Sequence, residues 1–335
     1  MDRPILQELV PFPRVWERLG VVERRLLETT TSEASPFLTD IAQHLLRAGG
    51  KRYRPLLTQV AAELGPEAGD APIEAGVAVE LVHVGSLYHD DVIDEAEARR
   101  GRVSVNHNWT NTIAILAGDF LLARASEVAA PLGEEAVALI ARTYATLCEG
   151  QILELRYGGD LSHGVDGYLE VIGGKTASLI RTSARLGALT GGAAPEVVEA
   201  VSDWAWEMGL VFQIADDVLD LVASEEWLGK PAGSDIREGV YTLPVLLAAE
   251  GPLRGRLEEL LVPEPPREPA IVEEVISLVV DGGYVDRALD HAVERVRRAE
   301  KAADVIDDPA VRTVLSNLDR YLLDRVEDAR RRSGR

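Results

Sequence analysis

The stretch HDDVIDEAEARRGR, residues 89–102, places a run of carboxylates directly before three arginines, in a chain whose formal net charge is −21 at pH 7. Its acidic part, DDVID at 90–94, has a near copy in DDVLD at 216–220, and each copy follows an apolar stretch with helical character. On an α-helix the first and fifth residues of such a motif lie on one face, about 6 Å apart along the axis. The repeated pattern therefore predicts helices that each carry an acidic site.

Carboxylates crowded in this way predict a bound cation. A single cluster on an exposed helix is usually solvated surface charge, but two copies within apolar helices favour a site. The carboxylates would repel each other without a cation, and Mg²⁺ bridging to phosphate oxygens suits one or two carboxylates per ion. The aspartates concerned are Asp90, Asp91, Asp94, Asp216, Asp217 and Asp220.

Basic residues near these motifs predict a phosphate partner. Three arginines follow the first acidic motif, where they would meet the outer oxygens of a metal-bound diphosphate. A second basic cluster, GGKRYRP at 49–55, lies between a glycine pair and a proline, and its alternative interpretation is capping of a helix C-terminus. The cations of the two clusters are Arg99, Arg100 and Arg102, and Lys51, Arg52 and Arg54.

The segment GGKT at 173–176 invites comparison with a nucleotide-binding P-loop. That loop requires glycine at position 169, where this chain has Leu169, and a preceding strand, where the sequence is helical. We therefore exclude a P-loop, although Lys175 and Thr176 can still supply a cation and a hydroxyl to a phosphate. Lys230, in GKPAGSD, lies on a loop after the second acidic motif.

Most of the remaining sequence predicts helices. Apolar residues recur at helical spacing, as in EEAVALIARTYATLCEGQILEL, and aromatic residues make up only 5% of the chain. The breaks, such as GPEAGDAP and VPEPPREPA, are too short to link independent domains. We expect an all-α, single-domain bundle of roughly a dozen helices over residues 1–335, with a frayed basic tail at 330–335.

Composition also excludes several classes of protein. The negative charge argues against nucleic acid as a partner, because neutralising its phosphates requires a broad basic face. The single cysteine, Cys148, excludes a disulfide framework and suits a reducing compartment. No run of eighteen uncharged apolar residues predicts a membrane span. We expect a cytoplasmic protein without a transmembrane segment.

Seven ordered motifs resemble those of the trans-isoprenyl diphosphate synthases, the polyprenyl synthetase family, of medium- or long-chain bacterial type. They are GGKRYRP, LYHDDVIDEAEARRG, GDFLLARA, GGKTASLI, FQIADDVLD, GKPAGSD and TLP, and they extend over nearly the whole chain. The resemblance implies helices around a central cavity, a homodimer, and Mg²⁺-dependent condensation of isopentenyl diphosphate with an allylic prenyl diphosphate. It also implies peripheral contact with a membrane for release of the product.

The resemblance assigns roles to residues by position. Isopentenyl diphosphate would be bound by Lys51, Arg54, His83 and Arg100. The allylic diphosphate would contact Arg99, Lys175, Thr176, Gln213 and Lys230. Three Mg²⁺ ions would be anchored by Asp90, Asp94 and Asp216, supported by Asp91, Asp217 and Asp220. These six aspartates, with Arg99 and Lys175, form the expected catalytic set. Without the resemblance, His83 would be interpreted as a core histidine.

Small residues upstream of the first motif predict a long product. Gly85 and Ser86 lie one helical turn before Asp90, where short-chain members have an aromatic floor, so we expect roughly thirty to fifty carbons. The alternative is that both residues serve close helix packing. The arginine-rich composition suggests a high-GC bacterium and a quinone side chain, such as that of menaquinone, as the use of the product.

Three other functions remain open. A farnesyl or geranylgeranyl diphosphate synthase would share every motif. A class I terpene cyclase shares one aspartate motif, but usually lacks the second and does not consume isopentenyl diphosphate. A non-catalytic subunit of a heteromeric synthase tends to lose aspartates from these motifs, and this chain keeps all six.

Overall fold

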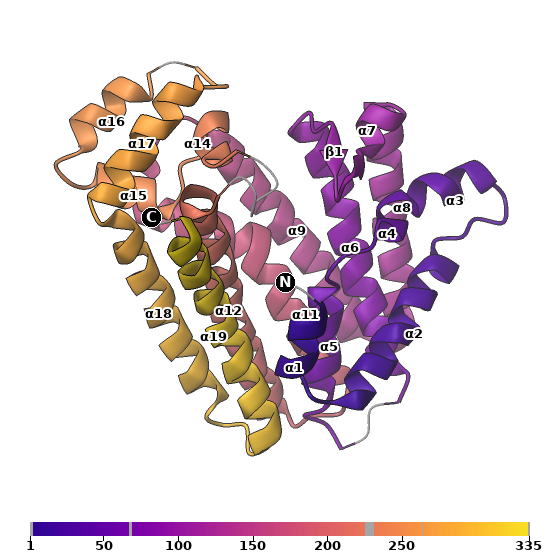
Figure 1. Cartoon of the computed structure of the whole chain (residues 1–335). Helices are drawn as coiled ribbons and strands as arrows, with labels where there is room; N and C mark the ends of the chain where they lie inside the picture. The colour runs from indigo at the N-terminus through magenta and orange to yellow at the C-terminus, as the bar shows by residue number, and fades with distance from the viewer. Residues whose placement is uncertain (1–2, 67–68, 225–230, 263, 334–335) are drawn as a thin grey trace. The chain divides into compact units, whose positions relative to one another are not determined.

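A computed structural model describes residues 3–66, 69–224, 231–262 and 264–333, and these residues form an all-α protein (Figure 1). The strands among them are β1 (Ala98–Arg99) and β2 (Arg102–Val103), which pair into one hairpin. The all-α prediction is confirmed. The described helices outnumber the expected dozen because several are only one or two turns long. The short ones are α1 (Arg3–Leu9), α3 (Pro36–Ala42), α4 (His44–Arg47), α7 (Val105–Asn108), α14 (Ser234–Glu238), α15 (Leu243–Ala249) and α16 (Arg254–Leu260).

The chain divides into two compact units built from interleaved segments. Unit 1 comprises Met1–Ala145, Leu179–Ser202 and Val305–Val314. Unit 2 comprises Thr146–Ser178, Asp203–Asp304 and Leu315–Arg335. Besides α11 (Ser178–Thr190), whose first residue alone lies in unit 2, three helices contribute residues to both units. They are α9 (Glu134–Tyr157), α12 (Pro195–Val222) and α19 (Pro309–Ser333).

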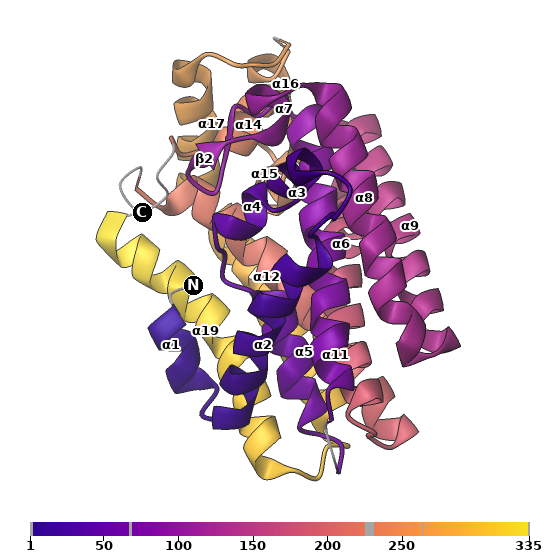
Figure 2. The ribbon, with the colours of Figure 1, turned by 90° about the vertical axis from the view of Figure 1, so that its right-hand side faces the viewer.

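In unit 1 the central element is α6 (Ala71–Ile93), which lies beside α8 (Asn111–Ala129) in Figure 2. Residues on most sides of α6 are buried, as expected of a helix with several packed neighbours. The remaining elements of this unit are α1 (Arg3–Leu9), α2 (Pro13–Thr29), α5 (Tyr53–Ala62), the 3₁₀ turn η1 (Ala130–Leu132) and α11 (Ser178–Thr190). Packing of α6 against α2, α5 and α8 fixes the helix that carries the first acidic motif.

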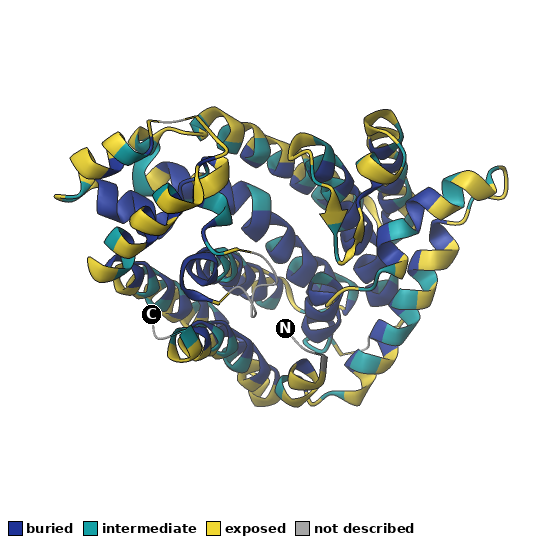
Figure 3. Ribbon diagram, turned by 45° about the horizontal axis from the view of Figure 1, so that its top comes forward, coloured by how far each residue is buried: buried dark blue, intermediate teal, exposed yellow. Residues whose placement is uncertain are grey.

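In unit 2 the helix at Tyr284–Ala303 buries one side and exposes the other. Buried residues of α18 (Tyr284–Ala303) recur every three or four positions, from Tyr284 to Ala303, and α18 packs against the wholly buried α15. Figure 3 shows the resulting division of helices into buried and exposed sides. The other elements are η2 (Leu161–His163), α10 (Gly164–Ile172), the π-helical turn η3 (Gly173–Ala177) and α17 (Pro269–Asp281).

Two terminal and surface features complete the fold. In the basic tail, α19 continues to Ser333 and Arg330 forms an ion pair with Asp286 at 2.7 Å, while residues 334–335 lie outside the described residues. Cys148, the only cysteine of the chain, is exposed on α9. Among the described residues, no helix combines the length and the apolar composition needed to cross a bilayer.

Candidate active site

The first acidic motif lies at the C-terminal end of α6. The backbone N–H of Asp94 donates to the carbonyl oxygen of Asp90 at 2.8 Å, so the two aspartates are one helical turn apart, as predicted. The Asp90 side chain is half-buried, and that of Asp94 is 51% exposed. Carboxylates at this end of a helix meet the negative end of its dipole. The position is therefore unfavourable for them unless cations are near.

Asp91, between these two, is fully buried and holds other groups in place. Its Oδ1 accepts a hydrogen bond from Arg99 Nε at 2.6 Å, and its carbonyl oxygen accepts one from Asn106 Nδ2 at 3.0 Å. Burial raises the pKa of Asp91, and the positive charge of Arg99 opposes that shift. Oδ2 has no hydrogen-bond partner in the part of the chain that the structure describes. Asp91 thus positions Arg99 beside the acidic motif.

The arginines after the motif lie on the β1–β2 hairpin, which the sequence analysis did not predict. Its turn residues, Arg100 and Gly101, have φ angles of 53° and 72°. Positive φ at both central positions is typical of the type I′ turn that joins two strands directly. The turn separates Arg99, which contacts Asp91, from Arg100, which extends toward the loop before α5.

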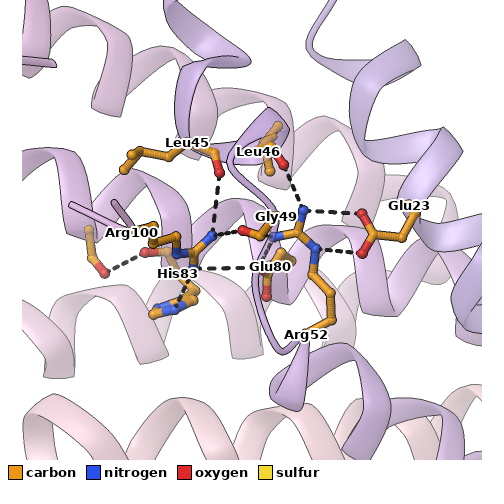
Figure 4. Close-up of polar contacts among 9 residues, drawn as sticks. Glu23, Leu45, Leu46, Gly49, Arg52, Glu80, His83 and Arg100 are labelled. Carbon is orange, nitrogen blue, oxygen red and sulfur yellow. Dashed lines mark hydrogen bonds and ion pairs between the residues drawn. The ribbon is translucent and has the colours of Figure 1, made fainter. Parts of the chain in front are cut away.

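Arg100 joins the basic loop to His83 (Figure 4). Its Nη1 donates to the carbonyl oxygen of Gly49 at 2.8 Å, and its Nη2 lies 3.4 Å from His83 Nε2. Burial lowers the pKa of His83 well below its usual value, and the positive charges of Arg54 and Arg100 lower it further. His83 is therefore neutral at physiological pH. The structure thus brings His83, Arg100 and the 49–55 loop together, as the resemblance implied.

The two remaining cations of this cluster differ in exposure. Burial lowers the pKa of Arg54 to about 10, with a smaller contribution from the positive charge of Arg100. Lys51 is exposed at the edge of the loop. A diphosphate bound here would relieve the repulsion among the arginines of this cluster.

The second acidic motif, on α12, is part of a chain of hydrogen bonds within unit 2. Asp217 Oδ2 accepts from the Tyr168 hydroxyl at 2.6 Å, and Oδ1 accepts from Gln213 Nε2 at 2.8 Å. Gln213 Oε1 in turn accepts from Thr176 Oγ1 at 2.7 Å. Burial raises the pKa of Asp217 to about 7, while the two hydrogen bonds oppose that shift. Both oxygens of Asp217 are engaged, so this residue positions Gln213 and Thr176.

The other two aspartates of this motif have different surroundings. The Asp216 side chain is 43% exposed and lies 3.7 Å from Arg325 Nη1. Asp220 is buried, and its carbonyl and carboxylate oxygens accept the backbone N–H groups of Gly233 and Asp235, at 2.8 and 3.3 Å. The end of the GKPAGSD loop is thereby fixed to the motif. Lys230, in the same loop, lies outside the described residues.

Lys175 and Thr176 lie in the π-helical turn η3. Glycines allow this turn to approach α9 closely, because a Cβ on Gly150 would lie 2.7 Å from the backbone nitrogen of Lys175. Lys175 Nζ forms an ion pair with Glu154 of α9. A helix, α10, precedes the turn, so the exclusion of a P-loop is confirmed. Single π-turns within helices are frequent at functional sites.

The two residues expected to limit product length have different neighbours. A Cβ on Gly85 would lie 3.2 Å from the carbonyl oxygen of Gly118 and from Leu122, on α8. This contact favours the packing interpretation for Gly85. Ser86 is half-buried, and its hydroxyl donates to the carbonyl oxygen of His83 at 2.9 Å.

The acidic motifs fit Mg²⁺ ions that are shared with a substrate. Among the described residues, no three Asp, Glu, His or Cys side chains gather into a metal site by themselves. Mg²⁺ commonly takes one or two carboxylates and completes its coordination with water and phosphate oxygens. Such an ion fits the accessible carboxylates at the end of α6 and the Oδ2 of Asp91, which has no hydrogen-bond partner among the described residues.

Sequence reasoning missed three residues of these sites. Glu80 lies beside the Arg52 and Arg100 guanidinium groups, Glu154 binds Lys175, and Tyr168 binds Asp217. Glu80 had a detectable signal, since it is the only carboxylate in the apolar stretch AGVAVELVHVGS. Glu154 and Tyr168 have no comparable signal.

Comparisons with known proteins agree with this geometry. Residues 35–279 match the family model for polyprenyl synthetase. The chain is 41% identical over 312 residues to nonaprenyl diphosphate synthase of Mycobacterium tuberculosis (strain ATCC 25618 / H37Rv), covering 92% of this chain and 93% of that protein. It is 36% identical over 328 residues to a short chain isoprenyl diphosphate synthase of Methanothermobacter thermautotrophicus, covering 96% of this chain and 99% of that protein.

A solved structure gives the same result for the fold. The crystal structure of polyprenyl synthase from Caulobacter crescentus CB15, complexed with calcium and isoprenyl diphosphate, matches with a TM-score of 0.87 at 34% identity. The match covers 95% of this chain and 97% of that one.

Proposed function

The chain belongs to the polyprenyl synthetase family, and from this membership we propose that it is a chain-elongating prenyltransferase that condenses isopentenyl diphosphate with an allylic prenyl diphosphate. One observation carries the proposal: each unit has its own group of basic and polar side chains, suited to a diphosphate, beside an aspartate motif. Unit 1 has Arg100 and His83, and unit 2 has Lys175 and Thr176. Two substrates with diphosphates need two such groups, whereas a cyclase with a single substrate needs one.

The basic groups divide between the substrates. For isopentenyl diphosphate we assign the cluster around the 49–55 loop, where several basic side chains gather. Its members are Lys51, Arg54, His83 and Arg100. For the allylic diphosphate we assign, from the sequence motifs alone, Arg99 and the η3 turn with its partners. Those residues are Lys175, Thr176, Gln213 and Lys230.

We assign three Mg²⁺ ions to Asp90, Asp94 and Asp216, the more accessible aspartates of the two motifs. When bound, Mg²⁺ supplies Lewis-acid stabilisation to the departing diphosphate. Asp91, Asp217 and Asp220 support the site by holding Arg99, Gln213 and the 231–235 loop. Lys175 and Arg99 neutralise the charge that develops on the leaving group. Apolar helices exclude water from the allylic cation.

The product that we propose is a long-chain polyprenyl diphosphate for a quinone side chain, such as that of menaquinone. The likeness to a nonaprenyl diphosphate synthase supports this length, as does the small Ser86 one turn before Asp90. The likeness to a short chain synthase keeps a shorter product as the alternative.

We also propose a cytoplasmic homodimer that contacts a membrane peripherally when it releases its apolar product. Ile115 and Leu116 on α8 are 44% and 58% exposed, and a partner subunit would cover such apolar side chains.

The test is to incubate purified protein with labelled isopentenyl diphosphate and allylic primers of several lengths, and to size the dephosphorylated products. Asp90→Ala or Asp216→Ala should lower turnover by about 10² to 10³ or more, because contacts to the leaving group are lost. Excess EDTA should abolish activity. Asp40→Ala, at an exposed aspartate, is the control and should leave turnover unchanged. Near-normal turnover in either motif variant, or full activity in EDTA, would contradict the metal assignment.

A further inference from the structure

Arg52 lies in the middle of the basic loop, yet its side chain points inward (Figure 4) and the residue is only 4% exposed. A guanidinium group has five N–H bonds. Nε and Nη2 donate to the two carboxylate oxygens of Glu23 at 2.9 and 3.1 Å, and Nη1 donates to Glu80 at 2.9 Å. The remaining two N–H bonds point to the carbonyl oxygens of Leu46, at 2.9 Å, and Gly49, at 3.4 Å. All five are engaged within the protein, so none remains for a substrate.

The backbone of Arg52 is also unusual. Its φ of 48° and ψ of 38° lie in the left-handed region, which costs a residue with a side chain about 1 kcal/mol or more. Arg52 is the N-cap of α5, and its side-chain contacts hold this conformation. The turn allows Lys51 to remain exposed while Arg54, in the first turn of α5, is half-buried. The conformation of one residue thus sets the directions of two cations.

Glu80 connects this loop to the rest of the isopentenyl diphosphate cluster. It is 1% exposed on α6, one helical turn before His83. One of its oxygens, Oε1, lies 2.9 Å from Arg52 Nη1 and 4.0 Å from Arg100 Nη2. The negative charge of Glu80 also opposes the lowering of the pKa values of Arg54 and Arg100 by burial. A single buried carboxylate therefore lies among the arginines that would face the diphosphate.

We propose that Arg52 is a positioning residue, not a substrate ligand, and that Glu23, Arg52 and Glu80 form a brace that fixes the Gly49–Lys51 loop and Arg100 before isopentenyl diphosphate binds. The inference rests on the proposed function of this cluster. Fixing the loop in advance reduces the entropy lost when the substrate binds, and so strengthens binding. The brace should therefore affect the affinity for one substrate and leave the chemistry of the bound complex nearly unchanged.

The chain contains a matched control for a purely structural role. Arg25 of α2 makes a two-bond contact with Glu74 of α6, at 2.8 and 3.2 Å, so it links the same two helices as the brace. This pair is partly exposed and has no contact with the loop. Loss of either link weakens the connection between α2 and α6, but only loss of the brace should change substrate affinity.

The experiment compares Arg52→Lys and Glu80→Gln with Arg25→Lys and Glu74→Gln. For the brace variants we expect the KM for isopentenyl diphosphate to rise about tenfold or more, with kcat and the KM for the allylic substrate within about twofold of wild type. The control variants should leave all three constants unchanged. An unchanged KM in a folded Arg52→Lys protein, an equal rise for both substrates, or the same rise in the controls would overturn the proposal.

Two additions keep the test decisive. If Arg52→Lys does not fold, Glu23→Gln replaces it, because Glu23 is 36% exposed and its loss removes only one side of the brace. Calorimetric titration with isopentenyl diphosphate, without turnover, tests the proposed function and the proposed brace separately. Wild-type protein that neither binds this substrate nor forms product contradicts the proposed function. Normal binding by the brace variants contradicts only the brace.

Discussion

At the scale of single residues, burial divides the charged groups of this protein into two kinds. Lys51 and Asp94 are exposed and can meet a ligand. Arg52, Asp91 and Asp217 are buried, and each forms hydrogen bonds with other side chains of the protein. An exposed residue of the same charge cannot take over the role of a buried one, because the buried residues hold the exposed residues in position.

Variants of the two basic groups should change the kinetic constants for different substrates. Lys51→Ala and Arg54→Ala should chiefly raise the KM for isopentenyl diphosphate, since both belong to the cluster with His83. Lys175→Ala should chiefly impair the allylic substrate, because this lysine lies in the η3 turn with Thr176. The measurement varies one substrate while the other is saturating. Equal effects of all three variants on both substrates would rule out the two-site division.

Asp319 provides a prediction about stability. It is buried on α19, and its Oδ2 accepts a hydrogen bond from Trp204 Nε1 at 3.0 Å. Burial raises its pKa to about 8; the Trp204 hydrogen bond opposes this shift, and the negative charge of Glu300 adds to it. An unfolded aspartate titrates near pH 3.9, so between about pH 4 and 8 the folded state retains a proton that the unfolded state loses. The contribution of Asp319 to stability is therefore lost as pH rises through this window.

Asp319→Asn removes this titration and keeps an acceptor for Trp204. The free energy of unfolding of the variant, relative to wild type, should increase with pH by at most about 1.4 kcal/mol per unit between pH 4 and 8. Urea unfolding at pH 5 and pH 8.5 measures the difference. Asp324→Asn, at an exposed position of the same helix, should show no such trend. A difference independent of pH would mean that Asp319 is ionised when buried.

At the scale of elements, α6 carries several residues of the candidate site. Glu80, His83, Ser86 and Asp90 follow each other at intervals of three or four residues, so they lie along one face of the helix over about 15 Å. The Ser86 hydroxyl is bonded to the carbonyl oxygen of His83, and Gly85 packs on α8. One helix therefore carries part of the proposed brace, the proposed substrate ligand His83, the position that would limit product length and the proposed metal ligand Asp90.

Ser86→Phe should shorten the product. A benzyl side chain one turn below Asp90 would obstruct the growing chain, and elongation should stop near roughly fifteen or twenty carbons while the first condensation still occurs. Product-length profiles of folded variant and wild type measure this. Ser86→Ala removes the hydroxyl without adding bulk and should leave the distribution unchanged. If Ser86→Phe is folded and active but still makes the wild-type products, Ser86 does not line the path of the chain.

Sequence predicted the helices and the acidic motifs because both depend on local spacing. Apolar periodicity identified α9 and α19, and one helical turn relates Asp90 to Asp94. The hairpin at 98–103 was missed because its turn is Arg-Gly instead of the Asn-Gly or Asp-Gly typical of this turn type. The inward orientation of Arg52 depends on Glu23 and Glu80, which are distant in sequence. Neither composition nor spacing distinguishes it from Lys51.

At the scale of the whole molecule, the chain passes repeatedly between its two units. Each unit is built from three segments, and α9, α12 and α19 contribute to both. The short breaks in the sequence offer no linker between them. These features support the proposal of a single domain.

The single-domain proposal predicts one cooperative unfolding transition. Scanning calorimetry should give a van't Hoff enthalpy close to the calorimetric enthalpy, because a shared helix cannot unfold in one unit and remain intact in the other. Two resolved transitions, each with its own enthalpy, would instead indicate independent domains.

Cys148, the single thiol of the chain, is exposed on α9 and so accepts a nitroxide without prior removal of other cysteines. One label per chain means one unpaired electron per chain, and any dipolar coupling in a pulsed paramagnetic resonance experiment must then arise between subunits. A two-fold symmetric dimer has one Cys148–Cys148 separation, so it would give a single narrow distance distribution. The native sequence therefore allows the distance between associated subunits to be measured without any mutation. The same sample can report whether adding substrate changes that distance.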